Sequence, residues 1–442
     1  MNISKKTKII IKELNEKLIE REHIVPILLL TLFSKSHMLL LGPPGVGKTY
    51  AIELITHFTK DLKYFEYLIT NNTLLDELFG SKIVDNEGNM VYNIEHSMLD
   101  SHICFIDELY KAPSTLINSL LGITHTSRSF FQRGRGKLTS PMISMFAASN
   151  ELPENEAVDA FDDRILFRFW VDEIRDITNF KRFAKRDFDR TKTFSTHFST
   201  DDLAYIHEES KNIFIHDDFV ALYTNIRIKL ATEKVFISDR KLQSSLDILQ
   251  TSAYINERNY VDLSELFLLL DIAWKRFEDI ERVKRIIFDT IFGNPSEVAS
   301  LLKNNQDYFK AIQAQIRSQA NILNYSYEYN GTNAEKNFNT HRETILSIKN
   351  NVQIVFLNFQ GLKDNYLFAM KMENMIEKNV FIPNYKNHIY DSDVVGEKRV
   401  NKNEIFEFAS HVSIALNKLN EWLNESVELY DYNNLKAKKS VA

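Results

Sequence analysis

The sequence predicts an α/β fold built on a parallel five-stranded sheet, followed by an all-α region. Five short apolar runs in the N-terminal part alternate with helical or turn-rich sequence, which is typical of a parallel sheet covered by helices. From about Thr200 the apolar residues follow helical spacing, as at Leu242, Leu246 and Leu249. Glycine and proline are scarce, at 12 and 8 residues, and several gather in residues 42 to 47. The breaks in regular structure are therefore concentrated in one loop.

Two helices are expected before the first strand. Apolar residues repeat with helical spacing from Ile9 to Leu18, and Pro26 then opens an apolar helix that runs through Leu32. The apolar runs that predict the five strands are His37 to Leu41, Tyr64 to Ile69, His102 to Ile106, Met142 to Ala148 and Ile165 to Val171.

Composition and charge favour a folded protein of a reducing compartment. Hydrophobic residues make up 44% and charged residues 26% of the chain, close to globular averages. The formal net charge of -6 argues against a dedicated DNA binder, although local basic patches are compatible with it. Cys104 is the single cysteine, so neither an internal disulfide nor a Cys-rich zinc site can form. The N-terminus lacks the apolar core of a signal peptide and no stretch is long enough to span a membrane, so we expect a cytoplasmic protein.

The glycine-rich loop predicts a phosphate-binding site. It follows the apolar run MLLL, precedes a helical pattern and reads Gly42, Pro43, Pro44, Gly45, Val46, Gly47, Lys48 and Thr49. Its backbone N–H groups and the helix N-terminus would surround the phosphates, Lys48 would reach the terminal phosphates, and Thr49 would offer its hydroxyl to Mg²⁺. The alternative is a chance match, which the strand before and the helix after the loop make less frequent.

Polar residues at two further strand ends extend this prediction. Asp107 and Glu108 end an apolar strand, where we assign Asp107 to Mg²⁺ through water and Glu108 to polarising the attacking water. The alternative is that Asp107 and Glu108 are solvated acidic residues at a strand end, without a role in catalysis. Asn150 ends a third strand and could position the same water, although by itself a strand-terminal asparagine is more often a loop cap.

In this order, the strand, phosphate loop, acidic strand end and strand-terminal asparagine resemble the AAA+ ATPases. Longer segments are similar to MoxR-type AAA+ proteins, especially the RavA-like subgroup, from about Ile11 to Arg282. They are FEYLIT with DELFG after it, IDELYKAPSTLINSLL, AASNELPENEAVDAFDDRILFRFWVD and ISDRKLQSSLDILQTSAY. The resemblance implies an ATPase that uses ATP and Mg²⁺, and Asn150 matches the first sensor of the family.

The resemblance also implies two arginines at the nucleotide. Arg164 falls where the family places the arginine finger that enters a neighbouring subunit's site, and Arg168 is the runner-up. Arg240 matches the second sensor of the helical lid, which closes over the nucleotide of its own subunit. The alternatives are a surface Arg164 paired with a neighbouring aspartate and a plain lid-surface Arg240. A finger acting in trans implies an oligomer, and the family precedent is a ring of six subunits.

Two insertions match hairpins of the family that face the pore or a partner. Residues 80 to 94 give two β-like runs around the turn sequence Asn86-Glu87-Gly88, and residues 127 to 141 would form the hairpin before the first sensor. The second carries basic residues beside two aromatics, which could bind nucleic acid or an acidic peptide. A solvated hairpin with buried phenylalanines is favoured. The residues concerned are Arg128, Phe130, Phe131, Arg133, Arg135 and Lys137.

We therefore expect three domains: an α/β nucleotide-binding domain at 1–195, a helical lid at 196–292 and a helical C-terminal bundle or adaptor at 293–442. The leading hypothesis is an ATP-driven ring that remodels or activates a partner protein, with family precedent pointing to a von Willebrand factor A-domain partner. One alternative is a nucleic-acid-directed or GTP-using subunit of a defence complex. Another is a nucleotide-gated scaffold with little turnover.

Overall fold

The structure is a computed structural model in which the chain divides into two compact units. It describes residues 2–84, 88, 90–125, 128–132, 136–150, 159–292 and 379–382, with the single positions 311, 314, 343, 347, 375 and 378. The first unit comprises Met1–Ile287 and Asn374–His388, and the second comprises Phe288–Glu373 and Ile389–Ala442. Nearly all described residues belong to the first unit. The predicted C-terminal domain at 293–442 lies almost wholly outside the described residues, and the three predicted domain boundaries stay predictions.

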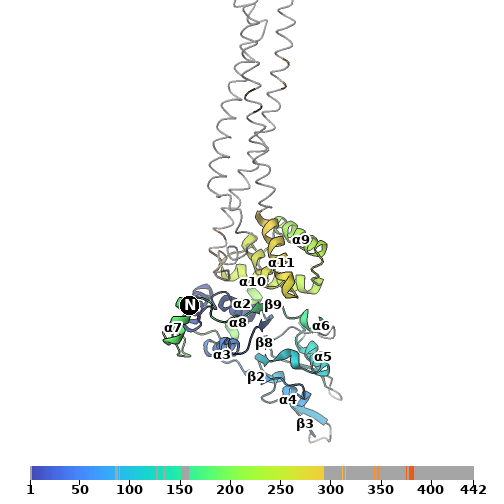
Figure 1. The fold of residues 1–442 in the computed structure, drawn as a ribbon. Helices are drawn as coiled ribbons and strands as arrows, with labels where there is room; N and C mark the ends of the chain where they lie inside the picture. Colours follow the sequence, from blue (N-terminus) through green and yellow to red (C-terminus); the bar gives the residue numbers. More distant parts are fainter. Residues whose placement is uncertain are drawn as a thin grey trace, which may run out of the picture. The chain divides into compact units, whose positions relative to one another are not determined.

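Five parallel strands form the central sheet, in the order β2-β5-β8-β1-β9 (Figure 1). They are β1 (His37–Leu41), β2 (Tyr64–Leu68), β5 (Ile103–Asp107), β8 (Ser144–Ser149) and β9 (Phe167–Trp170). Each lies within or overlaps one of the five predicted apolar runs. The predicted parallel five-stranded sheet is confirmed.

Burial explains which strands lie inside the sheet. Every residue of β1 and β8 is buried, as continuous apolar runs in a parallel sheet require, whereas β2 at the edge mixes buried and exposed positions. The register pairs Leu41 with Ser149. The loops that follow β1, β5 and β8 therefore leave the sheet side by side at its carboxyl edge, where ligands bind in open α/β sheets.

Helices cover this sheet. The two helices predicted before the first strand are present as α1 (Ile3–Lys17) and α2 (Val25–Phe33), and α2 is buried along its whole length with Pro26 in its first turn. The other helices of this part are α3 (Lys48–Phe58), α4 (Leu75–Phe79), η1 (Met98–Asp100), η2 (Leu109–Lys111), α5 (Ser114–Ile123), α6 (Asp159–Asp162) and α7 (Ile177–Ala184).

Both predicted hairpins are present. The first pairs β3 (Ser81–Val84) with β4 (Met90–Asn93), and the second pairs β6 (Ser129–Gln132) with β7 (Gly136–Thr139), each antiparallel. The turn residues 85–87 and 133–135 lie outside the described residues.

A helical layer follows the sheet, as predicted from the change to helical spacing near Thr200. It consists of α8 (Thr200–Ser210), α9 (Asp217–Thr232), α10 (Asp239–Ile255), η4 (Leu263–Asp271) and α11 (Phe277–Phe292). None of the helices in the part of the chain that the structure describes is long and apolar enough to cross a membrane.

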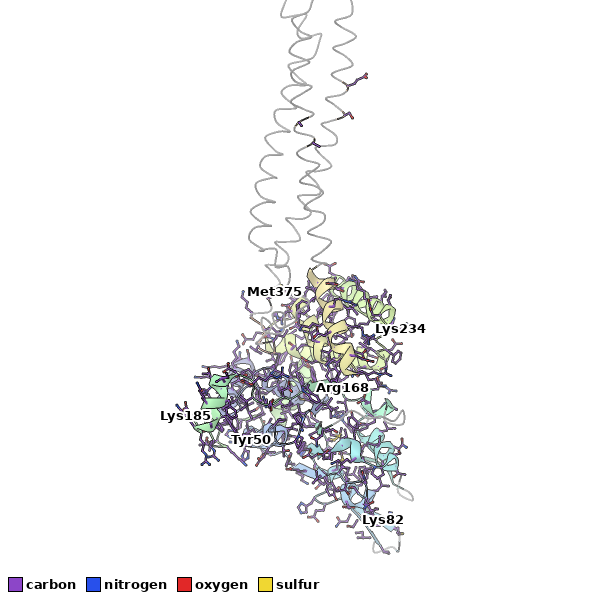
Figure 2. All side chains as sticks on the ribbon, in the orientation of Figure 1. Tyr50, Lys82, Arg168, Lys185, Lys234 and Met375 are labelled. Carbon is purple, nitrogen blue, oxygen red and sulfur yellow. The ribbon has the colours of Figure 1, made fainter. Side chains whose placement is uncertain are left out.

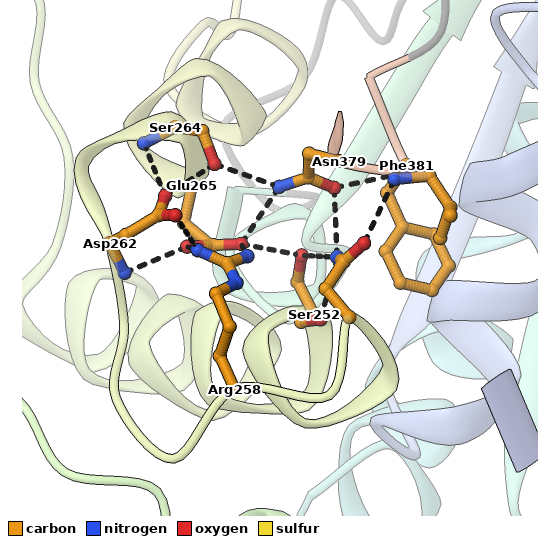
Figure 3. A network of polar contacts seen from close by, with 9 residues as sticks. Ser252, Arg258, Asp262, Ser264, Glu265, Asn379 and Phe381 are labelled. Carbon is orange, nitrogen blue, oxygen red and sulfur yellow. Dashed lines mark hydrogen bonds and ion pairs between the residues drawn. The ribbon is translucent and has the colours of Figure 1, made fainter. Parts of the chain in front are cut away.

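A buried polar network fastens residues 379–382 to this helical layer (Figure 3). Glu265 is fully buried and ion-paired with Arg258. The amide nitrogen of Asn379 donates to Oε1 of Glu265 at 2.8 Å and to Oγ of Ser264 at 3.0 Å. The amide nitrogen of Asn256 in turn donates to Oδ1 of Asn379 at 3.0 Å. The helical layer thus includes a segment that returns from more than 80 residues further along the chain.

Candidate active site

The glycine-rich loop leaves β1 at the carboxyl edge of the sheet and leads directly into α3. The N–H of Gly42 donates to the carbonyl of Ser149 at 3.2 Å. Gly42 has φ 145°, and a Cβ there would lie 2.1 Å from the carbonyl oxygen of Val171, so both conformation and space require glycine. Gly47, with φ 87°, caps α3 just before Lys48. The other loop residues are exposed or half-buried and accessible to a ligand: Pro43, Pro44, Gly45, Val46 and Thr49.

Lys48 connects this loop to β8. Its ammonium group donates to the carbonyls of Gly42 at 2.6 Å and Pro43 at 2.9 Å, and to Oδ1 of Asn150 at 2.9 Å. Burial lowers the pKa of Lys48, and nearby carboxylates oppose that shift. The positive charge is thus held within reach of the phosphate loop and of two neighbouring strand ends.

The acidic strand end lies beside both groups. Oδ2 of Asp107 is 3.5 Å from the hydroxyl of Thr49, so the two predicted Mg²⁺ ligands come from adjacent segments. The amide nitrogen of Asn150 donates to Oε1 of Glu108 at 2.6 Å, and Lys111 lies 3.4 Å from Oε2 of Glu108. The structure therefore brings together the predicted residues of the loop and of the two strand ends, namely Lys48, Thr49, Asp107, Glu108 and Asn150.

Glu108 has a left-handed backbone, with φ 55° and ψ 41°. This conformation is uncommon for a residue with a long side chain and is found more often where function constrains the backbone. Here it turns the chain sharply at the end of β5, and the N–H of Glu108 donates to Oδ1 of Asp107 at 2.9 Å.

These residues suit a magnesium nucleotide. Hydroxyl and carboxylate oxygens are the ligands that Mg²⁺ prefers, and it commonly takes few protein ligands and completes its shell with water and phosphate oxygens. No group of three or more His, Cys, Asp or Glu residues that could hold a metal occurs among the residues described. Thr49 and Asp107 could hold the ion, and Lys48 with the loop amides could hold the phosphates.

Arg164 lies away from this cluster, directly after α6. One of its terminal nitrogens donates to the carbonyl of Ala160 at 2.8 Å, and its Nε is buried without a hydrogen-bond partner among the described residues. Burial lowers the pKa of Arg164, and the nearby charge of Arg240 adds to that effect. Its predicted role in a neighbouring subunit's site stays a prediction.

Arg168, the runner-up finger, does not fit that role. It is 1% exposed and pairs with the carboxylate of Asp162 at 2.6 Å. Its other terminal nitrogen donates to the carbonyl of Trp274 at 3.1 Å, so the side chain joins the sheet to the helical layer (Figure 2). A residue held inside the unit in this way cannot reach a second subunit without disrupting the ion pair, and its role is structural.

Arg240, at the start of α10, contacts Asp163. Its terminal nitrogen lies 3.4 Å from Oδ2 of Asp163, and the hydroxyl of Ser238 donates to Oδ1 of the same carboxylate at 2.5 Å. Arg240 therefore lies close to Arg164 rather than in the Lys48 and Asn150 cluster. Its predicted contact with the nucleotide of its own subunit stays a prediction.

Sequence reasoning missed a turn that supports the phosphate loop. Arg21, between α1 and α2, is 8% exposed and donates to the carbonyl of Val46 at 3.0 Å and to that of Asp172 at 2.6 Å. No local pattern marks it, because its partners lie far away in the sequence. Arg21 therefore holds the backbone of the phosphate loop at Val46.

The basic hairpin yields one correction. Arg128 does not project as a surface cation: it donates to the carbonyls of Lys35 at 2.6 Å and Ile143 at 2.9 Å, and burial lowers its pKa to about 10. It is a structural residue at the base of the hairpin. Arg133 and Arg135 lie outside the described residues.

Two family models match this chain. Residues 5–204 match a family model described as the MoxR domain in the MoxR-vWA-beta-propeller ternary systems, and residues 218–287 match the model of an AAA lid domain.

Several relatives also match. A protein of Methanocaldococcus jannaschii without an assigned function is 32% identical over 308 residues, which cover 68% of this chain and 79% of that protein. The chaperone MoxR1 of Mycobacterium tuberculosis is 25% identical over 231 residues, which cover 50% of this chain and 58% of that protein. A crystal structure from Cytophaga hutchinsonii superposes with a TM-score of 0.52 at 19% identity, covering 65% of this chain and 94% of that one, which supports the fold alone.

Proposed function

Because the chain belongs to the MoxR-type AAA+ ATPases, we propose that it hydrolyses ATP with Mg²⁺ in a ring of subunits and uses the energy to remodel or activate a partner protein. The RavA-like subgroup inferred from the sequence stays a prediction.

One observation carries the hydrolysis proposal: Asn150 bridges Lys48 and Glu108, at 2.9 and 2.6 Å. A cation for the terminal phosphate, a carboxylate for the attacking water and an amide between them are the parts that phosphoryl transfer needs, since catalysis there is mostly positioning and electrostatic stabilisation. Asp107 and Thr49 add oxygen ligands for the metal at the same edge of the sheet.

The ring proposal rests on the need for an arginine that the described residues around Lys48, Glu108 and Asn150 do not supply. No arginine lies in the contacts of Lys48, Glu108 or Asn150 among the described residues, whereas an arginine that stabilises the transferring phosphoryl is worth roughly 10³–10⁵ in rate in related enzymes. Arg164 is partly accessible at the end of α6. A neighbouring subunit's Arg164 would complete the site, and a head-to-tail interface of this kind closes into a ring, with six subunits as the family precedent.

The proposed partner is a protein with a von Willebrand factor A domain. The support is the description of the matching family model, which names systems that combine a MoxR domain with such a domain. We propose that binding of this partner depends on the nucleotide state of the ring.

Steady-state phosphate release by three proteins tests the hydrolysis proposal. The wild type should hydrolyse ATP, Lys48→Ala should fail to bind it, and Glu108→Gln should bind it but turn over at least about 10²-fold more slowly, as expected for loss of a general base. A wild type as slow as Glu108→Gln, with both forming rings, would instead indicate a nucleotide-gated scaffold. The partner is tested by capture of a purified protein that contains a von Willebrand factor A domain on ATP-loaded Glu108→Gln, with Lys48→Ala as the control.

A further inference from the structure

The segment that carries Arg164 begins with the short helix α6. The N–H of Arg164 donates to the carbonyl of Phe161 at 2.9 Å, and a terminal nitrogen of Arg164 donates to the carbonyl of Ala160 at 2.8 Å. Both acceptors belong to α6, so the place and direction of the Arg164 side chain depend on how this helix is held. A helix of 4 residues has too few internal hydrogen bonds to hold its own position. Contacts with the rest of the unit must therefore fix it.

Two side chains of α6 anchor this helix in the unit. Phe161 is fully buried. Asp162 is 2% exposed, and its Oδ2 pairs with Arg168 of β9 at 2.6 Å. The hydroxyl of Tyr110 donates to Oδ1 of the same carboxylate at 2.7 Å. Buried polar atoms need hydrogen-bond partners, and a hydrogen bond to an ionised acceptor is among the stronger ones. Tyr110 therefore supplies one of the contacts that fix α6.

Tyr110 belongs to the turn that also carries Glu108. The helix η2 begins directly after Glu108, and the N–H of Lys111 donates to the carbonyl of Glu108 at 2.9 Å. The carboxylate of Glu108 accepts from Asn150 in the nucleotide site, whereas Tyr110 contacts the helix that precedes Arg164. The helix α5, which follows this turn, packs against α6 as well (Figure 1). One short turn thus contacts both the nucleotide site and the support of the predicted finger.

We propose that Tyr110 is a positioning residue for the arginine finger. Its hydrogen bond to Asp162 holds α6 in the place from which Arg164 enters the nucleotide site of the neighbouring subunit. This inference rests on the proposed function, in which Arg164 acts in trans. It extends that function, because the turn at the end of β5 then serves two nucleotide sites. Glu108 serves the site of its own subunit, and Tyr110 serves the next one through Arg164.

The expected size of the effect follows from how strongly a finger depends on its position. An arginine finger contributes roughly 10³–10⁵ in rate, and a displacement of about 1 Å from the productive geometry can cost about 10²-fold. Tyr110→Phe keeps the aromatic ring and removes only the hydroxyl, while Phe161 and the pair of Asp162 with Arg168 remain. We therefore expect this change to lower finger-dependent hydrolysis at least about tenfold without abolishing it.

Rings mixed from two inactive variants separate the subunit that hydrolyses ATP from the subunit that supplies the finger. The donor carries Lys48→Ala and cannot bind ATP, and the acceptor carries Arg164→Ala and supplies no arginine. In this reference mixture, finger-dependent hydrolysis takes place at acceptor sites that receive Arg164 from a donor. Tyr110→Phe is then added to the donor in one mixture and to the acceptor in another, and phosphate release is measured over a range of ATP concentrations.

The effect of Tyr110→Phe should depend on which subunit carries it. In the donor it should lower the recovered kcat at least about tenfold and leave KM for ATP within about threefold, because the acceptor sites that bind ATP are unaltered. In the acceptor it should leave the recovered kcat within about threefold of the reference mixture. The matched control is Tyr67→Phe in the donor. It also removes a hydrogen bond from a phenol to a carboxylate, that of Glu77, and should leave the recovered kcat unchanged.

Several outcomes would overturn the inference. An unchanged rate with the altered donor would mean that Tyr110 does not position Arg164. A rate that falls only with the altered acceptor would mean that Tyr110 acts on Glu108 of its own site. An equal fall in both mixtures, or a fall matched by an equal loss of assembled rings in sedimentation velocity, would mean that the hydrogen bond to Asp162 maintains the fold or the assembly instead.

The reference mixture distinguishes failure of this inference from failure of the proposed function. If the reference mixture recovers hydrolysis and the altered donor is as effective as the unaltered one, the inference falls and the proposed function stands. If the wild type is active but the reference mixture recovers nothing, the role of Arg164 in trans is wrong and the inference falls with it. A wild type that neither assembles nor hydrolyses ATP would overturn both.

Discussion

The amide nitrogen of Asn150 donates a 2.6 Å hydrogen bond to the carboxylate of Glu108, while Oδ1 of Asn150 accepts from Lys48. An asparagine is suited to this place because its amide offers a donor to the acid and an acceptor to the cation at the same time. The pair links the strand end that would activate water to the lysine that would hold the terminal phosphate.

Replacing Asn150 by aspartate should change the pH dependence of ATP hydrolysis. The new carboxylate would lie beside Glu108, and a like charge at this distance raises the pKa of one member of the pair. We expect the acid limb of the kcat profile to move to higher pH and the rate at pH 7 to fall at least about tenfold. Asn150→Ala is the control: its rate of ATP hydrolysis should fall, but the acid limb of its kcat profile should stay at the same pH. An unshifted profile for Asn150→Asp would count against close contact of the two side chains during turnover.

Mixing two inactive variants should reveal which arginine acts on a neighbour's nucleotide. Lys48→Ala cannot bind ATP in its own site but supplies a normal Arg164 to the neighbouring subunit. Arg164→Ala has an intact nucleotide site but supplies no arginine to its neighbour. Mixed rings should therefore regain hydrolysis that neither variant shows alone, because some Arg164→Ala sites receive the arginine of a Lys48→Ala neighbour. Arg164→Ala mixed with Glu108→Gln should recover in the same way.

The same experiment decides the role of Arg240. If Arg240 acts within its own subunit, as the sequence predicts, Arg240→Ala mixed with Lys48→Ala should show no recovery. Recovery would mean that Arg240 acts on the neighbour beside Arg164, in agreement with the carboxylate of Asp163 that lies near both side chains.

Stability measurements should separate the two candidate fingers. Arg168→Met leaves the buried carboxylate of Asp162 without its partner, and breaking a buried ion pair from one side costs about 3–5 kcal/mol. Arg164→Met removes a half-buried side chain with one backbone contact and should cost under about 1 kcal/mol. Guanidinium unfolding of the nucleotide-free proteins measures both. Equal losses would contradict the structural role assigned to Arg168.

The sequence predicted those parts of the protein whose signal is local. Apolar runs marked all five strands. The inner strands contain few polar residues because both of their faces are buried, whereas β2 at the edge has exposed positions as well. The loop around Lys48 and the acids Asp107 and Glu108 were identifiable because each follows a strand directly. Asn150 needed the family resemblance, since a strand-terminal asparagine has a commoner role as a loop cap.

Contacts between segments that lie far apart in the sequence could not be predicted from local sequence patterns. The partnership of Asp163 with Ser238 and the clamp of Arg21 on Val46 join residues that share no periodic pattern. Arg168 could be read as an exposed finger because a charged residue in a strand is seldom buried unless paired, and Asp162, its partner, gives no local sign of the pairing. The return of Asn379 to the helical layer likewise depends on tertiary packing alone.

Lys241, in the first turn of α10, should make stability depend on pH. It is 6% exposed, and burial lowers its pKa from 10.5 to about 7, with Arg168 and Lys275 adding to the shift and Asp162 and Asp163 opposing it. Between these two pKa values the unfolded chain binds more protons than the folded one, so stability rises with pH from about 7 towards 10. Lys241→Met removes this group.

The stability of Lys241→Met relative to the wild type should therefore be greatest at the low end of this pH range. Relative to the wild type, the free energy of unfolding of Lys241→Met should be highest near pH 7, and the difference between the two proteins should shrink as the pH is raised to 9. Guanidinium unfolding at pH 7, 8 and 9 measures it, with the exposed Lys60→Met as the matched control. The control reports the effect of the same lysine-to-methionine change at an exposed position. A constant difference for Lys241→Met would mean that Lys241 stays charged inside the folded protein, held by Asp162 and Asp163.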